Sequence, residues 1–84
     1  MVTINALVSK AHEMDARRIA LLVQTACGYE ADIRLKCDGR KMNAKSLMGV
    51  ITLGITGGKE VEISTFGEDE EEAAAGIAAF LQEA

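Results

Sequence analysis

The chain has 84 residues, of which 49% are hydrophobic and 26% are charged, and its formal net charge is −4. This length allows one domain over residues 1–84, and the composition is that of a globular rather than a disordered protein. The net charge argues against direct binding of nucleic acid or of an anionic membrane, and three aromatic residues leave little material for base stacking.

Charge is unevenly distributed along the chain. Residues 1–45 hold eight Lys/Arg and five Asp/Glu, whereas residues 46–84 hold one Lys and eight Asp/Glu. The amino-terminal half therefore offers cations to an acidic partner. Cys27 and Cys37 lack metal-site spacing, so we expect no metal, no cofactor and two reduced, buried thiols. Neither a signal-peptide pattern nor a membrane-spanning run is present, which favours a cytoplasmic location.

The first half of the chain predicts a strand followed by a helix. Apolar and polar residues alternate over 2–8, which is typical of a half-buried strand. A polar loop over 9–15 follows, and apolar residues then recur at helical spacing. The pattern predicts a helix over 16–27, with Asp15 as its N-cap and Gly28 at its end.

The middle of the chain predicts a hairpin and a short helix. Apolar residues alternate with polar ones over 33–37, and Asp38-Gly39 then forms the pair that suits a two-residue type I′ turn. A short third strand is expected through Met42. Ser46 precedes an apolar run, which predicts a short helix with Ser46 at or beside its N-cap.

The carboxy-terminal part predicts one more strand and a helix. The strand is centred on Val61 and Ile63, and an acidic run over 67–72 leads into an alanine-rich helix. Acidic residues at a helix start complement the helix dipole, so the run has a structural explanation. The order β-α-β-β-α-β-α predicts an α+β domain: a four-stranded antiparallel sheet with three helices on one face.

Three segments of the chain carry a family resemblance: Ala16-Arg17, the run Leu22-Val23-Gln24-Thr25-Ala26 and the block Asn43-Ala44-Lys45-Ser46-Leu47-Met48-Gly49-Val50. They resemble HPr, the small phosphocarrier family of the bacterial sugar phosphotransferase system. The resemblance spans the chain without gaps, and Gly67-Glu68-Asp69-Glu70 also fits it. It implies the family's HPr-like open-faced β-sandwich, which agrees with the element order predicted above.

The chain departs from this family in its active loop. The family's loop reads Gly-Ile/Leu-His-Ala-Arg-Pro, and its histidine carries the phosphoryl group. The matching residues 13–18 read Glu-Met-Asp-Ala-Arg-Arg. The resemblance therefore puts Asp15 at the histidine position and Arg18 at the proline position. It retains Arg17, which would hold the phosphoryl group.

Several roles are open for the residues of this loop. Asp15 could be a nucleophile that forms an acyl phosphate, but only if cations neutralise its charge. It could instead cap the helix, or supply a fixed negative charge that resembles the phosphorylated histidine. His12, the one histidine, could be an acceptor in a shifted register, and a solvated loop residue is its default interpretation.

Ser46 carries the second functional hypothesis. In Gram-positive relatives the matching serine is the target of HPr kinase/phosphorylase, and a phosphate is favoured at a helix start. The resemblance thus implies a regulatory, non-enzymatic paralogue that is phosphorylated on Ser46 and binds a catabolite control regulator. The expected contact residues are Arg17, Ser46, Leu47, Met48 and Val50.

Two alternatives to regulation remain open from the sequence. One is a phosphocarrier that passes phosphate from enzyme I to sugar permeases through Asp15 or His12. The other is an HPr-like domain used for an unrelated protein contact.

Overall fold

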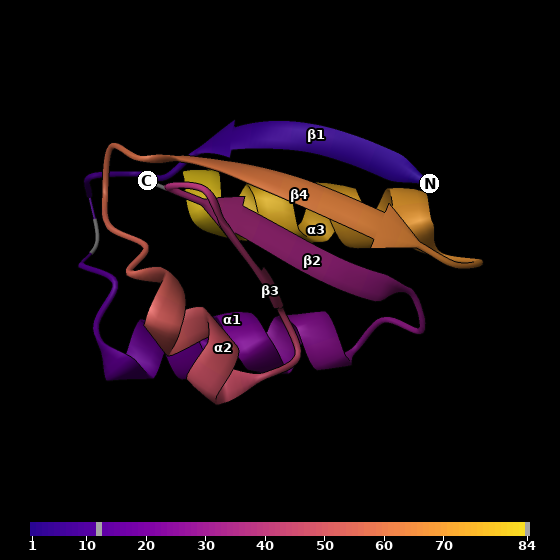
Figure 1. The fold of residues 1–84 in the computed structure, drawn as a ribbon, viewed down its shortest axis with the longest axis horizontal. Coiled ribbons are helices and arrows are strands. Elements are labelled where there is room, and N and C mark those ends of the chain that lie inside the picture. Colours follow the sequence, from indigo (N-terminus) through magenta and orange to yellow (C-terminus); the bar gives the residue numbers. More distant parts are fainter. Residues whose placement is uncertain (12, 84) are drawn as a thin grey trace.

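The computed structural model describes residues 1–11 and 13–83, so His12 lies outside the described residues. In chain order its elements are β1 (Val2–Leu7), α1 (Ala16–Cys27), β2 (Asp32–Cys37), β3 (Arg40–Asn43), α2 (Leu47–Leu53), β4 (Glu60–Phe66) and α3 (Glu70–Gln82), as Figure 1 shows. Each strand and helix predicted from the sequence is present, within two residues of its expected position where a range was predicted.

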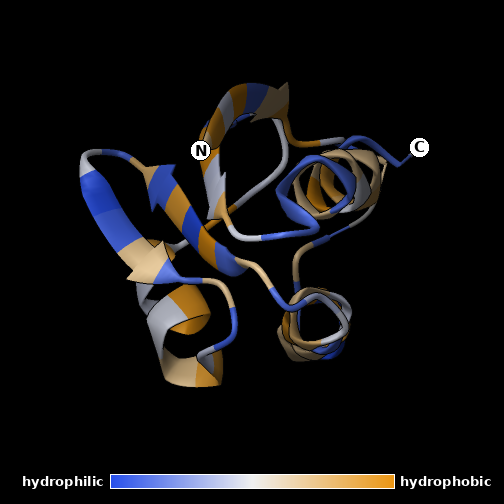
Figure 2. Cartoon of the chain, turned by 90° about the vertical axis from the view of Figure 1, so that its right-hand side faces the viewer, coloured by the Kyte–Doolittle hydropathy of each residue, from blue (hydrophilic) through white to orange (hydrophobic). Residues whose placement is uncertain are grey.

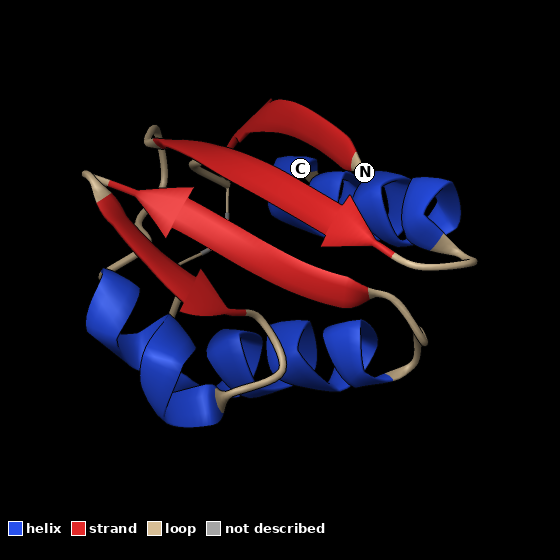
Figure 3. Ribbon diagram, turned by 45° about the vertical axis from the view of Figure 1, so that its right-hand side comes forward, coloured by secondary structure: helices blue, strands red, loops and turns tan. Residues whose placement is uncertain are grey.

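The strands form one antiparallel sheet in the order β1-β4-β2-β3. Ile63 of the central strand β4 pairs with Ile4 on one side and with Leu35 on the other. The helices pack against one face of the sheet and leave the other face open (Figure 3). The fold is therefore the predicted open-faced α+β sandwich.

The core lies between the sheet and the helices. Alternate residues of β2 point into it, and Ile33, Leu35 and Cys37 are at most 1% exposed. Leu22 of α1 and Ile77 of α3 are fully buried on the helical side. The alternation of hydropathy along the strands is visible in Figure 2, and it is the signal from which the strands were predicted.

The predicted turn and helix ends are also in place. Asp38 and Gly39 both have positive φ, 53° and 82°, as a type I′ turn requires. Gly28 follows the last residue of α1, but its φ of −76° is that of an ordinary helical residue. Its use as the C-cap therefore does not depend on the left-handed conformation, unlike Gly54 after α2, whose φ is 65°.

The prediction for the two thiols is half right. Cys37 is buried in β2, and desolvation by burial raises the pKa of its thiol. Cys27 is exposed, which corrects the expectation that it lies in the core. It occupies the last position of α1, adjacent to the buried Ala26 but outside the inward stripe of the helix.

Part of the acidic run makes contacts beyond its own helix. Asp69 stands at the N-cap of α3 but makes no side-chain capping bond there. Its carboxylate instead accepts the backbone N–H groups of Glu30 at 2.8 Å and Ala31 at 2.7 Å. These bonds tie the loop after α1 to the start of α3, and the bond from Glu30 contributes most to lowering the pKa of Asp69.

Within residues 1–11 and 13–83, no helix has the length and apolar character needed to cross a membrane. The same residues contain no group of three or more His, Cys, Asp or Glu side chains placed to hold a metal ion.

Candidate functional site

The start of α1 is built around the side chain of Asp15. Its backbone is extended, with φ −78° and ψ −179°, and its carbonyl oxygen accepts the N–H of Ile19 at 2.9 Å. Its Oδ1 accepts the backbone N–H of Arg18, also at 2.9 Å. Asp15 therefore caps α1 as the sequence predicted, and satisfies one of the N–H groups that a helix start leaves free.

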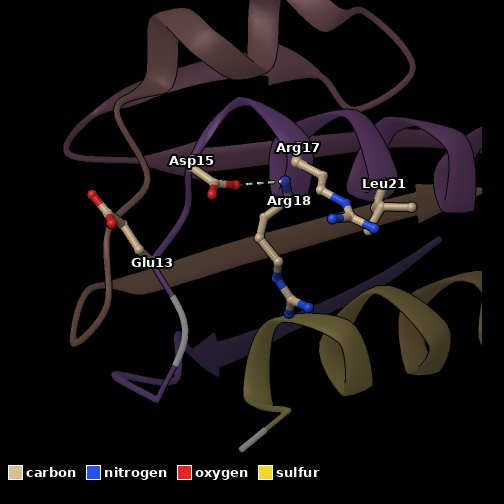
Figure 4. Close-up of a pocket in the computed structure, with 5 residues that line it drawn as sticks. All are labelled: Glu13, Asp15, Arg17, Arg18 and Leu21. Carbon is tan, nitrogen blue, oxygen red and sulfur yellow. Dashed lines mark hydrogen bonds between the residues drawn. The ribbon is translucent and has the colours of Figure 1, made fainter.

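A shallow hollow of about 360 Å³ lies beside this cap. It is lined by Glu13, Asp15, Arg17, Arg18 and Leu21, which Figure 4 shows as sticks. The carboxylate of Glu13 lies apart from that of Asp15, and the Arg17 side chain extends along α1 toward Leu21. Among the residues that the structure describes, neither guanidinium forms an ion pair with Asp15.

Arg18 extends from α1 to α3. Its guanidinium carbon lies 4.6 Å from the centre of the Phe80 ring, a cation–π distance, and its Nη2 lies 3.8 Å from Oε2 of Glu83. The side chain is 20% exposed, and its buried Nε has no hydrogen-bond partner within the described part of the chain. The positive charge of Arg18 is thus directed toward α3 and away from the Asp15 carboxylate (Figure 4).

This geometry suits a cap better than a nucleophile. A carboxylate that accepts a phosphoryl group must have its negative charge neutralised, and here one oxygen receives a neutral backbone N–H while Arg18 is paired elsewhere. Arg17 is exposed and is available to a partner. The shifted-register hypothesis for His12 concerns a residue outside the described ones.

Ser46 forms a second helix start with a similar hydrogen bond. It is exposed, its backbone is extended, and its Oγ accepts the N–H of Gly49 at 3.2 Å. The neighbouring Lys45 ammonium donates to the carbonyl of Tyr29 at 2.6 Å. Lys45, the residue before Ser46, is therefore bound to the loop that follows α1.

The apolar residues that follow Ser46 divide into an exposed and a buried set. Leu47 is 46% exposed, Met48 71% and Ile51 46%, so α2 presents apolar side chains to solvent. Val50, which we expected on the contact surface, is only 1% exposed. This is a correction: Val50 lies on the inward side of the short helix with Leu53 and packs in the core.

Arg17 and Ser46 lie at opposite ends of α1. The bond from Lys45 to Tyr29 places the start of α2 beside the carboxyl end of α1, whereas Arg17 is in its first turn. A helical rise of 1.5 Å per residue separates the two ends by roughly 15 Å. A partner that contacts both must span α1.

The sequence prediction missed two residues on this side of the molecule. Leu21 is 41% exposed on α1, and Ile51 is 46% exposed on α2. Both lie outside the buried face of their helix, so the helical spacing of the apolar residues could have predicted that they are exposed. We use "helical face" below for Arg17, Leu21, Leu47, Met48 and Ile51.

The fold and the site define a class of small proteins with an open-faced sheet and a polar site at the start of the first helix. The family described as "PTS HPr component phosphorylation site" matches residues 2–83, and the chain belongs to this HPr family. It is a divergent member that lacks the phosphoryl-accepting histidine, since Asp15 occupies that position.

Several known proteins are similar to this chain over most of its length. "HPr-like protein Crh" of Bacillus subtilis (strain 168) is 46% identical over 70 residues, which cover 83% of this chain and 82% of that protein. The protein of the same name from Halalkalibacterium halodurans is 41% identical over 69 residues, 82% of each chain. The crystal structure of phosphocarrier protein HPr from Bacillus anthracis str. Ames has a TM-score of 0.91 at 42% identity and covers 96% of both chains. The chain is therefore an HPr-like paralogue within the phosphotransferase and catabolite-regulation proteins.

Proposed function

We propose that this chain is a regulatory protein that is phosphorylated on Ser46 by an HPr kinase/phosphorylase and then binds a catabolite control regulator. In this proposal it is not an enzyme, and it does not carry phosphate between enzyme I and sugar permeases. Its function is then to present one modified surface to a protein partner.

The capping bond of Asp15 is the observation that carries this proposal. The residue at the family's phosphoryl-accepting position has its Oδ1 bound to the Arg18 N–H at 2.9 Å. Phosphoryl transfer would require a carboxylate oxygen to attack phosphorus while cations offset the charge of both groups. The hydrogen bonding at the start of α1 supplies a cap, and among the residues that the structure describes neither Arg17 nor Arg18 forms an ion pair with this carboxylate.

The surroundings of Ser46 favour modification. The hydroxyl is exposed and stands at the N-cap of α2, a position beside the backbone N–H groups that a helix start leaves without intrahelical partners. No acidic residue lies in the first turn of α2, so no like charge on that turn repels a dianion. The exposed apolar residues Leu47, Met48 and Ile51 lie next to it and offer area to a partner.

Incubation with an HPr kinase and a nucleoside triphosphate tests the modification. We expect a mass increase of one phosphate in the wild type and none in Ser46→Ala. Incubation with enzyme I and phosphoenolpyruvate tests the alternative, and we expect no phosphate at Asp15 or at His12. An acyl phosphate on Asp15, or a phosphohistidine at position 12, would establish a phosphocarrier instead.

Titration against a catabolite control regulator tests the partner. The phosphorylated protein should bind more tightly, by about 1.5–3 kcal/mol through charge-assisted hydrogen bonds, and added salt should weaken this gain. Met48→Ala should weaken binding without changing phosphorylation. Leu7→Ala is the matched control, because Leu7 is 61% exposed on β1, outside the helical face. Equal affinities for the two forms would remove the switch.

A further inference from the structure

The two positions at which the active loop departs from the family pattern are joined by one hydrogen bond. The backbone N–H of Arg18 donates to Oδ1 of Asp15 at 2.9 Å. Proline has no backbone N–H, so a proline at position 18 could not make this bond. The capping bond that Asp15 makes here, to the N–H three positions later, therefore requires a residue other than proline at position 18.

The side chain of Arg18 extends away from Asp15 and contacts α3. The guanidinium lies over the ring of Phe80 at 4.6 Å and reaches Glu83 at 3.8 Å, so the first turn of α1 is fastened to the last turn of α3. The side chain is 20% exposed, which means that most of it is packed.

We propose that Arg18 is a positioning residue that commits Asp15 to capping α1 and thereby keeps residue 15 out of phosphoryl transfer. The backbone of Arg18 supplies the donor, and its side chain carries the guanidinium to α3 instead of to the Asp15 carboxylate. Residues 15 and 18 then act as one coupled pair. This inference rests on the proposed function, because it explains why the site at α1 is not a phosphocarrier site.

A double-mutant cycle on unfolding tests the coupling. Asp15→Ala should raise the unfolding equilibrium constant about fivefold, the effect of losing one N-cap bond. In the Arg18→Pro background the same change should have a clearly smaller effect, because the N–H donor is already absent and only the charge of Asp15 at the helix start is lost. Arg18→Ala is the matched control: it removes the guanidinium and keeps the N–H, so the effect of Asp15→Ala should persist there. An equal effect in all three backgrounds would overturn the proposal.

Hydrogen exchange of the residue-18 amide gives a measurement that does not depend on the proline variant. We expect the amide to exchange about fivefold more slowly in the wild type and in Arg18→Ala than in Asp15→Ala, which lacks the acceptor. An amide that exchanges equally fast with and without Asp15 would show that the bond does not form in solution, and would overturn the proposal.

Phosphoryl acceptance by a histidine at position 15 separates the positioning role from stability. In the reaction with phosphorylated enzyme I, an imidazole nitrogen lone pair attacks phosphorus, the new N–P bond forms, and the bond to the donor breaks with its electron pair remaining on the donor. An N–H at position 18 competes for that lone pair. Asp15→His combined with Arg18→Pro should therefore accept phosphate about tenfold faster than Asp15→His combined with Arg18→Ala.

The outcome of this comparison is independent of the regulatory proposal. Equal rates in the two histidine variants would overturn the role of Arg18 and leave Ser46 phosphorylation untouched. Conversely, failure of Ser46 phosphorylation would overturn the proposed function, whereas the unfolding cycle and the amide exchange would still report on Asp15 and Arg18.

Discussion

The starts of α1 and α2 use the same hydrogen bond and differ in its chemistry. In α1 a carboxylate oxygen of Asp15 accepts the N–H three residues later at 2.9 Å, and in α2 the hydroxyl of Ser46 accepts the corresponding N–H at 3.2 Å. Asp15 brings a permanent negative charge to its helix start. Ser46 is neutral and carries a hydroxyl that can be esterified with phosphate.

This difference shows how one local motif can be either a fixed or a switchable feature. An anion at a helix start is favoured by the helix dipole, whether it is a carboxylate or a phosphate. At α1 that anion is built into the sequence. At α2 the anion can be added and removed as a phosphate on Ser46, so in our proposal only the start of α2 acts as a regulatory switch.

The two helix starts also differ in the tertiary contacts that hold them. The largest expected change in the free energy of unfolding comes from disturbing the contacts next to the start of α2. Lys45 binds the carbonyl of Tyr29, and the hydroxyl end of the Tyr29 side chain lies against Gly76 of α3. A Cβ at position 76 would overlap the Tyr29 hydroxyl and come within 2.9 Å of its Cζ. Gly76→Ala should lower the free energy of unfolding by about 1–3 kcal/mol, as measured by urea denaturation.

The control for this change is a smaller side chain at position 29. Tyr29→Phe removes the hydroxyl that the new Cβ would meet, so the double variant should recover part of the loss. A Gly76→Ala protein as stable as the wild type, or more stable through better helix propensity, would show that Tyr29 does not depend on the space at Gly76.

As caps the two residues should be nearly equivalent. Asp15→Ala and Ser46→Ala should each lower the free energy of unfolding by about 1 kcal/mol, because each leaves one N–H of a first turn without its acceptor. Thermal or urea unfolding of both variants measures this. A midpoint that is unchanged within error in either variant would mean that its side chain does not cap in solution.

Exchanging the two chemistries should produce smaller effects of opposite sign. Asp15→Ser keeps a capping oxygen but removes the charge, and should cost about 0.3–1 kcal/mol through the helix dipole. Ser46→Asp should gain a few tenths of a kcal/mol for the same reason. Both effects should shrink in 1 M salt. Effects that are insensitive to salt would attribute the difference to hydrogen bonding alone.

Asp69 at the start of α3 should make the stability of the protein depend on pH. The carboxylate of Asp69 accepts hydrogen bonds from the backbone N–H groups of Glu30 and Ala31. These bonds lower its pKa from the usual 3.8. An acidic group whose pKa is lower in the folded state stabilises the protein at pH values above its unfolded-state pKa. This contribution is lost as the pH falls through the folded-state pKa. Stability should therefore decline below about pH 4, and less so in Asp69→Asn.

The neighbouring Glu68→Gln serves as the control for this measurement, because Glu68 is exposed. Urea denaturation at pH 7 and pH 3 should show the same decline in Glu68→Gln as in the wild type. A decline in Asp69→Asn as steep as in the wild type would assign the acid sensitivity to other carboxylates.

Most of the fold could be predicted because its signals are local. The alternation in β2, the Asp38-Gly39 turn and the caps at Asp15 and Ser46 each depend on residues within a few positions of one another. Local pattern also placed Asp15, Arg17 and Arg18 at one helix start, where the structure has them.

The features that were missed depend on contacts between distant residues. Asp69 binds a loop 38 positions away, and Arg18 packs on Phe80 near the end of the chain. No periodicity encodes such pairs. Val50 and Cys27 were misplaced because a short helix and a helix end give too few residues to fix which side faces inward.

The strand order has a consequence for how the molecule assembles. The central strand β4 pairs with both β1 and β2, and Val2 at one end of the chain meets Thr65 near the other. Until residue 66 has been synthesised, β1 has no strand to pair with, and the β2–β3 hairpin is not joined to it in a sheet. Closing a loop of this length must precede most of the stabilising contacts, so sheet formation is a late and non-local step, which slows folding relative to a helical protein of equal size.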